Sequence, residues 1–219
     1  MPEKVAKITK PSTDDFKKER KLFFVPLVFK GMDSPGDYLE KLGQYWKQVE
    51  KQIEELELKL GSIQKIYHEL AAAGDKEGLE AIKDLNEESY KIIKKKIEEG
   101  GQLQATEDSD TLTAFMDWSR CLAIGLQNQK VLSTIYQSYI EAGKKRNESI
   151  AKRLDETLKP DEIGILFMRE GHQVQFPTDI QVFYVAPPAL DEINRWIRDH
   201  ESRKMNESEA KEKDKEESK

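Results

Sequence analysis

The chain has 219 residues, a length that predicts one domain with short tails. Its net charge is -6 and its pI is about 5.4, and this acidic balance argues against a general nucleic-acid-binding protein. No segment approaches the ~20 apolar residues of a membrane-spanning helix, and the single cysteine, Cys121, excludes an intramolecular disulfide framework. We therefore expect a cytoplasmic protein that binds neither nucleic acid nor a membrane.

Composition divides the chain into three parts. Residues 1–20 are polar and include Pro2 and Pro11, so we expect a flexible N-terminal segment. Residues 21–200 carry the periodic apolar patterns and are expected to form a single α/β domain. Residues 201–219 are highly charged and have almost no apolar surface to bury, which predicts a disordered tail. A helical extension of the preceding element is the alternative for that tail.

The first predicted strand covers residues 21–29, KLFFVPLVF, which are β-branched and aromatic and precede a turn rich in glycine and proline. Pro26 lacks the N–H that would donate to a neighbouring strand, so it predicts an edge position or a bulge.

The next segment can be divided in two ways. Residues 37–60 have apolar side chains at alternating spacings of three and four, which predicts an amphipathic helix. Gly61 is typical of a helix stop, and residues 62–69 then become a short strand. If the helix instead continued in the same register, residues 36–73 would form one long helix and the protein would be mainly a helical bundle.

The later elements predict an α/β fold. In chain order they are short helices at 79–85 and 90–97, a strand at 102–106, helices at 112–126 and 129–158, strands at 163–168 and 179–185, and a final helix ending near 200. Strands that alternate with helices predict a mainly parallel sheet of about five short strands, with long amphipathic helices on its faces. The link at 169–178 is short for a parallel crossover, so the relative orientation of the last two strands stays open.

Candidate site residues follow three of the predicted strands, because ligands of open α/β sheets bind beyond the carboxyl ends of the strands. These residues are His68 and Glu69 after the second strand, Glu107 and Asp108 after the third, and Arg169, Glu170, Gly171 and His172 after the fourth. In a parallel sheet they would share one edge. His172 is the candidate acid/base group or metal ligand, because imidazole titrates near neutral pH. Its alternative role is that of a loop histidine that caps a backbone group.

Arg146 lies on the apolar stripe of the helix predicted at 129–158, four residues before Ile150. A charged side chain at such a position must pair with an opposite charge or extend out of the core. Pairing with an inward carboxylate such as that of Glu69 would satisfy both groups.

The segment KRNESIAKRL at 145–154 contains Arg146-Asn147 and Ala151, and it precedes an apolar strand and then Gly171-His172. This arrangement resembles the closing segment of the TraB, Tiki, ChaN and erythromycin esterase group, in which a glutamate also ends an earlier strand. The resemblance implies an α/β fold with a pocket lined by Glu69, Arg146 and His172. Some members of that group are hydrolases, some depend on a metal, and ChaN-like members bind haem.

The chain departs from the pattern of that group in its first strand. That strand typically leads into Gly-x-x-His, whereas residues 22–31 contain no histidine. The sequence also lacks the nucleotide-loop, nucleophile-elbow, Cys-x-x-Cys and His-Glu-x-x-His motifs. It therefore specifies neither a metal nor a cofactor.

Two functions are compatible with these residues. The favoured one is a non-catalytic binding or interaction protein with a pocket at the carboxyl edge of its sheet, in which the helix at 37–60 pairs with a protein partner or with a second copy. The alternative is a hydrolase-like enzyme. His172 would then be the general base toward water, and Glu69 and Arg146 would position it or stabilise developing charge.

Overall fold

The computed structural model describes residues 19–31 and 34–217, with the side chains of those up to residue 203. Its strands are β1 (Arg20–Pro26), β2 (Lys65–His68), β3 (Gln102–Leu103), β4 (Ile163–Met168) and β5 (Ile180–Tyr184). Its helices are α1 (Gly36–Leu60), α2 (Lys76–Leu85), α3 (Glu87–Glu98), α4 (Ser109–Ala123), α5 (Gln129–Thr157) and α6 (Pro188–Glu217). The predicted helix-rich α/β class is confirmed, and the helical-bundle alternative is wrong. The flexible segment expected at 1–20 lies outside the described residues, apart from its last two.

The five strands form one parallel sheet in the order β3-β2-β4-β1-β5. β1 therefore lies inside the sheet, between β4 and β5, and the edge position or bulge predicted from Pro26 is wrong. Pro26 is tolerated because it is the last residue of the strand, where a missing N–H interrupts no continuing ladder.

The helix stop at Gly61 is confirmed. α1 ends at Leu60, and the Gly61 N–H donates to the Glu57 carbonyl oxygen at 2.9 Å. Gly61 has a φ of 118°, which side chains other than glycine rarely adopt. The backbone leaves the helix at this point and enters β2 four residues later, at Lys65.

The last two strands are parallel, which resolves the orientation that the sequence left open. β5 does not pair with β4; it lies on the other side of β1. Two strand spacings amount to about 10 Å, and an extended chain covers about 3.3 Å per residue. The link at 169–179 is therefore long enough to cross β1 and to return to the edge where the parallel strands begin, without forming a helix.

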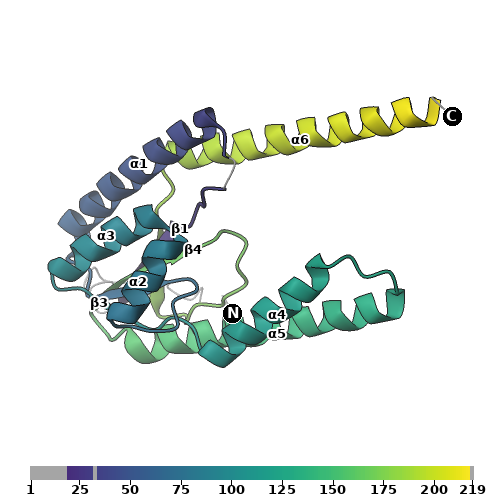
Figure 1. Cartoon of the computed structure of the whole chain (residues 1–219). Coiled ribbons are helices and arrows are strands. Elements are labelled where there is room, and N and C mark those ends of the chain that lie inside the picture. The colour runs from purple at the N-terminus through teal and green to yellow at the C-terminus, as the bar shows by residue number, and fades with distance from the viewer. Residues whose placement is uncertain (1–18, 32–33, 218–219) are drawn as a thin grey trace, which may run out of the picture.

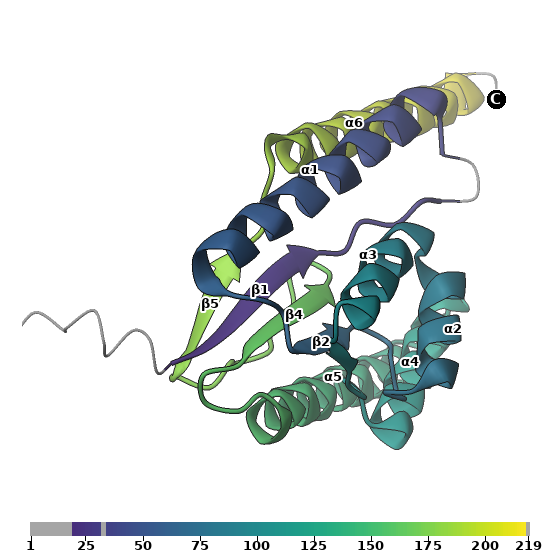
Figure 2. The same cartoon turned by 90° about the vertical axis from the view of Figure 1, so that its left-hand side faces the viewer.

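Helices cover both faces of the sheet (Figure 2). α1, α3 and α6 pack on one face, where the strand side chains of Phe23 and Val25 point. The C-terminal half of α5 packs on the other face, against Leu22 and Phe24. This alternation follows from the two-residue period of a strand and places the core on both sides of β1 and β4.

α4 and the first part of α5 project from the domain as a helical hairpin (Figure 1). Residues 111–140, which we call the arm, contain no buried residue. The arm therefore differs from the rest of α5, whose buried side chains are Arg146, Ile150 and Leu154.

The final helix is longer than the sequence predicted. α6 continues to Glu217, whereas residues 201–219 were expected to be a disordered tail. The structure instead has the helical extension that was the alternative for this tail, and the helix ends at Glu217. Its physical basis is that Glu and Lys, which dominate this segment, are strong helix formers even without an apolar face.

Candidate functional site

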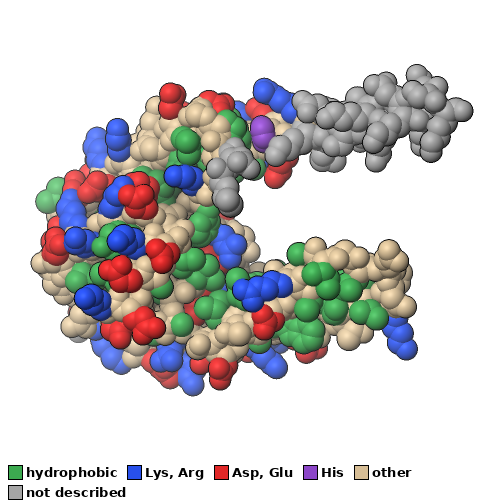
Figure 3. Space-filling model, in the orientation of Figure 1, with side chains coloured by type: hydrophobic (Ala, Val, Ile, Leu, Met, Phe, Trp, Pro, Cys, Tyr) green, Lys and Arg blue, Asp and Glu red, His purple; other side chains and the backbone are tan. Residues whose placement is uncertain are grey.

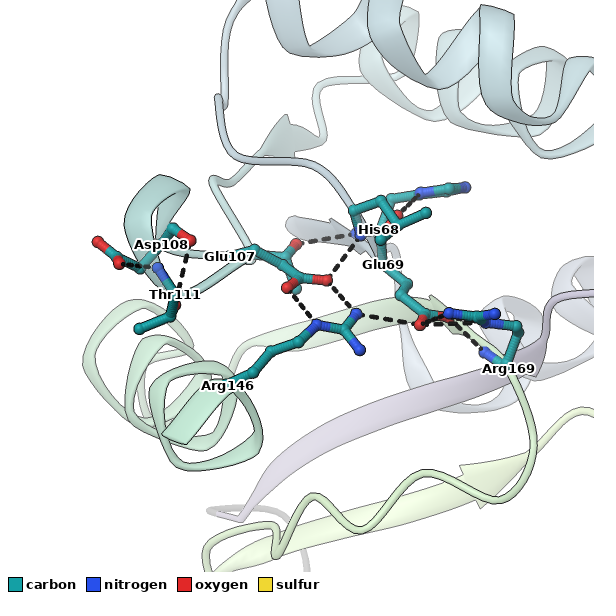
Figure 4. Close-up of polar contacts among 9 residues, drawn as sticks. His68, Glu69, Glu107, Asp108, Thr111, Arg146 and Arg169 are labelled. Carbon is teal, nitrogen blue, oxygen red and sulfur yellow. Dashed lines mark hydrogen bonds and ion pairs between the residues drawn. The ribbon is translucent and has the colours of Figure 1, made fainter. Parts of the chain in front are cut away.

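The parallel sheet brings the ends of three strands to one edge, as the sequence predicted. Glu69 follows β2, Glu107 lies four residues after β3, and Arg169 follows β4. Arg146 reaches the same edge from α5. Figure 4 shows these four side chains linked in series by ion pairs, from Glu107 through Arg146 and Glu69 to Arg169, and we refer to them as the ionic cluster.

Arg146 is the centre of the ionic cluster. Its Nε donates to Glu107 Oε2 at 2.6 Å, and its Nη2 donates to Glu107 Oε1 and, at 3.0 Å, to Glu69 Oε1. Arg169 approaches Glu69 from the other side, with its Nη2 2.8 Å from Oε1 and its backbone N–H 2.9 Å from Oε2. The predicted pairing of Arg146 with Glu69 is confirmed.

Sequence reasoning missed the principal partner of Arg146. Glu107 and Asp108 were candidate site residues after the third strand, but neither was matched with Arg146. Asp108 is the N-cap of α4 and accepts a hydrogen bond from the Thr111 N–H at 3.0 Å. Glu107 instead points inward and also accepts the Leu70 N–H at 2.8 Å. The available signal was the need of Arg146, on an apolar stripe, for a buried carboxylate.

The ionic cluster balances its own charge, with two guanidinium and two carboxylate groups. Burial alone would raise the pKa of Glu69, but hydrogen bonds from Arg169 and Arg146 lower it to about 2. Burial likewise opposes the charge of Arg146, and the contacts with Glu107 and Glu69 more than compensate, so its pKa is raised. Glu69 and Arg146 therefore stay ionised near neutral pH and have no proton to exchange there.

His172 lies apart from the ionic cluster. Its Nδ1 accepts a hydrogen bond from the Val174 backbone N–H at 3.2 Å, and its ring packs against Phe24 and Phe176. Within the part of the chain that the structure describes, it makes no hydrogen bond to Glu69 or Arg146. The three predicted site residues are thus brought to one edge, but only two of them touch.

The protonation of His172 follows from its contacts. Burial lowers its pKa, against the opposing charge of Glu69, so the ring is neutral near pH 7. Because Nδ1 accepts a hydrogen bond, the proton of the neutral ring sits on Nε2. In this arrangement the ring can donate a hydrogen bond, but its lone pair is engaged by its own backbone. The geometry matches a loop histidine that caps a backbone group.

His68, the other candidate histidine, is an interior residue. Its Nδ1 lies 2.5 Å from the Glu69 carbonyl oxygen, and its Nε2 lies 3.1 Å from the Ser89 hydroxyl. A carbonyl oxygen can only accept, so Nδ1 carries the proton and Nε2 is the acceptor toward the Ser89 hydroxyl, which also lies 3.0 Å from the Asn86 carbonyl oxygen. Burial lowers the pKa of His68 to about 4, so it stays neutral and holds β2 against α3.

A cleft does open at the carboxyl edge, but beyond β1 rather than at the ionic cluster. It has a volume of about 410 Å3 and lies between α1 and the junction of α2 with α3. Val28 and Lys30, which follow β1, form part of its wall together with Trp46. Glu69, Arg146 and His172 do not line it. This cleft is therefore separate from Glu69, Arg146 and His172, the residues that the sequence analysis placed around a pocket.

The residues of the ionic cluster do not fit a metal site. Both carboxylate oxygens of Glu69 already accept hydrogen bonds from arginines. Among the described residues, no group of three or more His, Cys, Asp or Glu side chains is arranged to hold a metal ion. None of the described helices has the length and apolar character to cross a membrane.

Comparisons of the chain with protein-family models, with curated proteins and with solved structures found no match. The resemblance to the TraB, Tiki, ChaN and erythromycin esterase group, which includes Arg146 and His172, therefore stays a prediction from the sequence.

Proposed function

We propose that the protein is a non-catalytic interaction protein, that its binding element is the arm, and that the arm binds the arm of a second copy. The observation that supports it most is that none of the apolar side chains of these two amphipathic helices is fully buried between residues 111 and 140. Ile124, Tyr136 and Ile140 are 71%, 56% and 51% exposed. Contiguous exposed apolar side chains mark interaction surfaces more often than isolated ones do.

The charge of the arm indicates what kind of surface it binds. Residues 111–140 hold only three charged side chains, in a chain that is 36% charged. Two of them, Asp117 and Arg120, form an ion pair with each other at 2.8 Å. Lys130 is the third charged side chain of the arm. A surface with so little charge cannot select a partner by charge complementarity. Its occupant must be apolar and uncharged, and the same surface on a second copy meets that requirement.

The shape of the arm is suited to pairing with itself. Each of its helices spans about 20 Å at 1.5 Å per residue. Tyr136 and Ile140 are four residues apart and so lie on one face of α5. Figure 3 shows apolar side chains spread over this part of the molecule. Two such hairpins packed face to face would form a four-helix bundle with two-fold symmetry, which is the commonest symmetry of homo-oligomers.

The ionic cluster supports this proposal as an anchor for the arm. Glu107 immediately precedes the N-cap of α4, and Arg146 lies on α5 just beyond the arm. The Arg146 guanidinium also lies over the Phe115 ring of α4, at 4.9 Å. Both helices are therefore tied to the sheet edge at their base. In this proposal Arg146 and Glu69 position the arm and perform no chemistry.

The helix at 37–60 is less suited to partner binding than the sequence suggested. Most of its apolar stripe is buried within the same chain, including Leu42, Val49 and Ile53. Leu58, which is 88% exposed, is its main outward apolar side chain. The interaction expected for that helix is therefore reassigned to the arm.

The hydrolase-like alternative has one supporting observation. Among the described residues, His172 Nε2 has no hydrogen-bond partner, so it can approach a bound molecule. A general base needs a free lone pair directed at the attacking water, and Nδ1 of His172 is engaged by Val174. Glu69 and Arg146 are likewise occupied with each other. The interaction proposal is therefore the better supported of the two.

Sedimentation equilibrium of the full chain, from micromolar to millimolar concentration, tests the proposal. We expect a monomer–dimer equilibrium that Ile140→Glu shifts at least tenfold toward monomer. Leu58→Glu is the matched control, because it also places a carboxylate at an exposed apolar helix position, and it should leave the equilibrium unchanged. A wild-type chain that is monomeric throughout the range would overturn the proposal. A dimer that only Leu58→Glu disrupts would return the interface to α1.

A further inference from the structure

β5 is an edge strand whose outer backbone groups have no partner among the residues that the structure describes. It is the last strand in the order of the sheet, and Figure 2 shows it at the border, beside β1. The Val185 N–H donates to the Phe24 carbonyl oxygen of β1 at 2.8 Å. Because backbone groups alternate between the two sides of a strand, those of Phe183 also face β1, and those of Val182 and Tyr184 face outward. These two residues therefore present two N–H and two carbonyl groups to an added strand.

The opposite edge of the sheet is protected, whereas β5 is not. β3 has only two residues, and the backbone of Gly74 packs against it, since a Cβ on Gly74 would lie 2.8 Å from the Leu103 carbonyl oxygen. Proteins commonly protect edge strands by short length, by a covering segment, or by proline and charged side chains. The five residues of β5, IQVFY, include neither a proline nor a charged side chain. The outer side of β5 thus has the features of an edge that accepts a further strand.

The face of β5 on the α5 side is also uncovered. Val182 and Tyr184 are in register with Leu22 and Phe24 of β1, which α5 helps to bury. Val182 and Tyr184 are themselves 41% and 51% exposed. β-branched and aromatic side chains on adjacent strands stabilise a sheet when they pack side by side. A strand added at this edge would place its own apolar side chains next to these two, at alternate positions.

An uncompensated carboxylate charge lies at each end of β5. At its start, the buried guanidinium of Arg20 is shared between Asp155 and Asp179, whose side chains are 59% and 60% exposed, so one cation faces two carboxylates. At its end, the neutral Tyr184 hydroxyl donates to Glu170, which forms no ion pair within the described part of the chain. The edge is therefore uncharged along its length and negative at both ends.

Two further charges near the start of β5 offset each other. Glu19 contacts the Gln181 side chain, and Lys21 of β1 is in register with Gln181. A second copy of β5 does not suit this edge, because antiparallel pairing would place Asp179 of one chain near Glu170 of the other.

We infer that β5 binds an extended segment of a partner protein, which adds to the sheet as a sixth strand. The central residues of that segment are uncharged and β-branched or aromatic, and a lysine or arginine lies at each end, opposite Asp179 and Glu170. The interaction does not involve the arm, so it is independent of the function proposed above.

Two synthetic peptides test the inference: acetyl-KVTVTVK-amide, and acetyl-EVTVTVE-amide as the control with reversed charges. The readout is hydrogen exchange of single backbone amides in the full chain, followed in 1H–15N spectra. We expect the amides of Val182 and Tyr184 to exchange rapidly in the free chain and to be protected saturably by the lysine peptide. The Phe183 amide, which faces β1, is the internal control and should exchange slowly throughout.

The size of each effect follows from the contact that is removed. The glutamate peptide should bind about tenfold more weakly at low salt, because it places like charges at both ends. Val182→Pro removes an outward N–H without touching the ladder to β1, and it should weaken binding about fivefold, the ratio that one hydrogen bond contributes. Val182→Thr keeps that N–H and is the matched control. Glu170→Gln should reduce the preference for the lysine peptide about threefold.

Several results would overturn the inference: no protection by the lysine peptide, equal binding of the two peptides, or binding that Val182→Pro leaves unchanged. Protection of Val182 and Tyr184 without peptide would also overturn it. Such protection would assign the edge to a second copy if it rises with protein concentration, and to another part of the same chain if it does not. If Val182→Pro does not fold, Glu170→Gln and the comparison of the peptides decide.

Discussion

Arg146 on α5 holds the carboxylate of Glu107 through two hydrogen bonds, although the two residues are 39 positions apart and lie on either side of the arm. The pair is buried, and Glu69 and Arg169 complete its charge balance. A buried ion pair contributes little net stability compared with apolar packing, but removing one partner leaves a charge without compensation. Removing one partner should therefore cost enough stability to measure, and this cost tests the role of the pair at the base of the arm.

Arg146→Ala should lower the free energy of unfolding by about 3–5 kcal/mol, because it leaves the carboxylates of Glu107 and Glu69 short of a buried counter-charge. Arg169→Ala is the matched control. Arg169 is 51% exposed, so water can replace it, and we expect a loss of only about 1 kcal/mol. Urea unfolding followed by circular dichroism measures both. Equal losses would show that Arg146 is not the central residue of the ionic cluster.

Stability should fall as the pH drops below about 6.5, because His68 is held neutral in the folded chain. Its pKa is about 4 when folded, against 6.5 as the ordinary value. Between these values the unfolded chain binds a proton that the folded chain does not. Stability is therefore fully present above pH 6.5 and decreases by roughly 3 kcal/mol toward pH 4.

Urea unfolding at a series of pH values from 7 to 4.5 measures this decrease. His68→Gln should flatten the dependence in that window, whatever its effect at pH 7. Glu69 does not interfere, because its pKa is lowered from 4.5 to about 2 and its contribution is lost only below about pH 4.5. A slope unchanged in His68→Gln would assign the effect to another group.

Two helix glycines should respond in opposite directions to alanine. Gly43→Ala should raise the free energy of unfolding by about 0.5–1 kcal/mol, because a helix-interior glycine costs about that much and the added methyl group meets no atom within 4 Å. Gly78→Ala should lower it, because its Cβ would lie 2.1 Å from the Ala73 carbonyl oxygen. Thermal melting of the two variants gives the comparison, and a loss in Gly43→Ala would contradict the open space above that residue.

His172→Ala should change neither chemistry nor assembly. It removes packing against Phe24 and Phe176 and should cost about 1 kcal/mol of stability. Initial rates on a panel of activated esters should be at background for both wild type and variant. A wild-type activity that His172→Ala abolishes while the melting temperature is retained would instead establish the hydrolase-like alternative.

Local chemistry determined much of this protein. The helix stop at Gly61 depends on a conformation that favours glycine, and six consecutive apolar residues at 163–168 suit a strand covered on both faces. Arg146, on an apolar stripe, had to find a carboxylate. Each of these predictions is confirmed, because each rests on the period of a helix or strand or on the cost of burying a charge within a single segment.

Only the tertiary structure decided how the segments combine. The interior position of β1 around Pro26, the inward turn of Glu107 and the separation of His172 from the ionic cluster all depend on strand order and on loop paths. The same holds for the arm, whose apolar pattern resembles that of α1. A periodic pattern identifies which face of a helix is apolar, but what covers that face depends on contacts between residues that are distant in the chain.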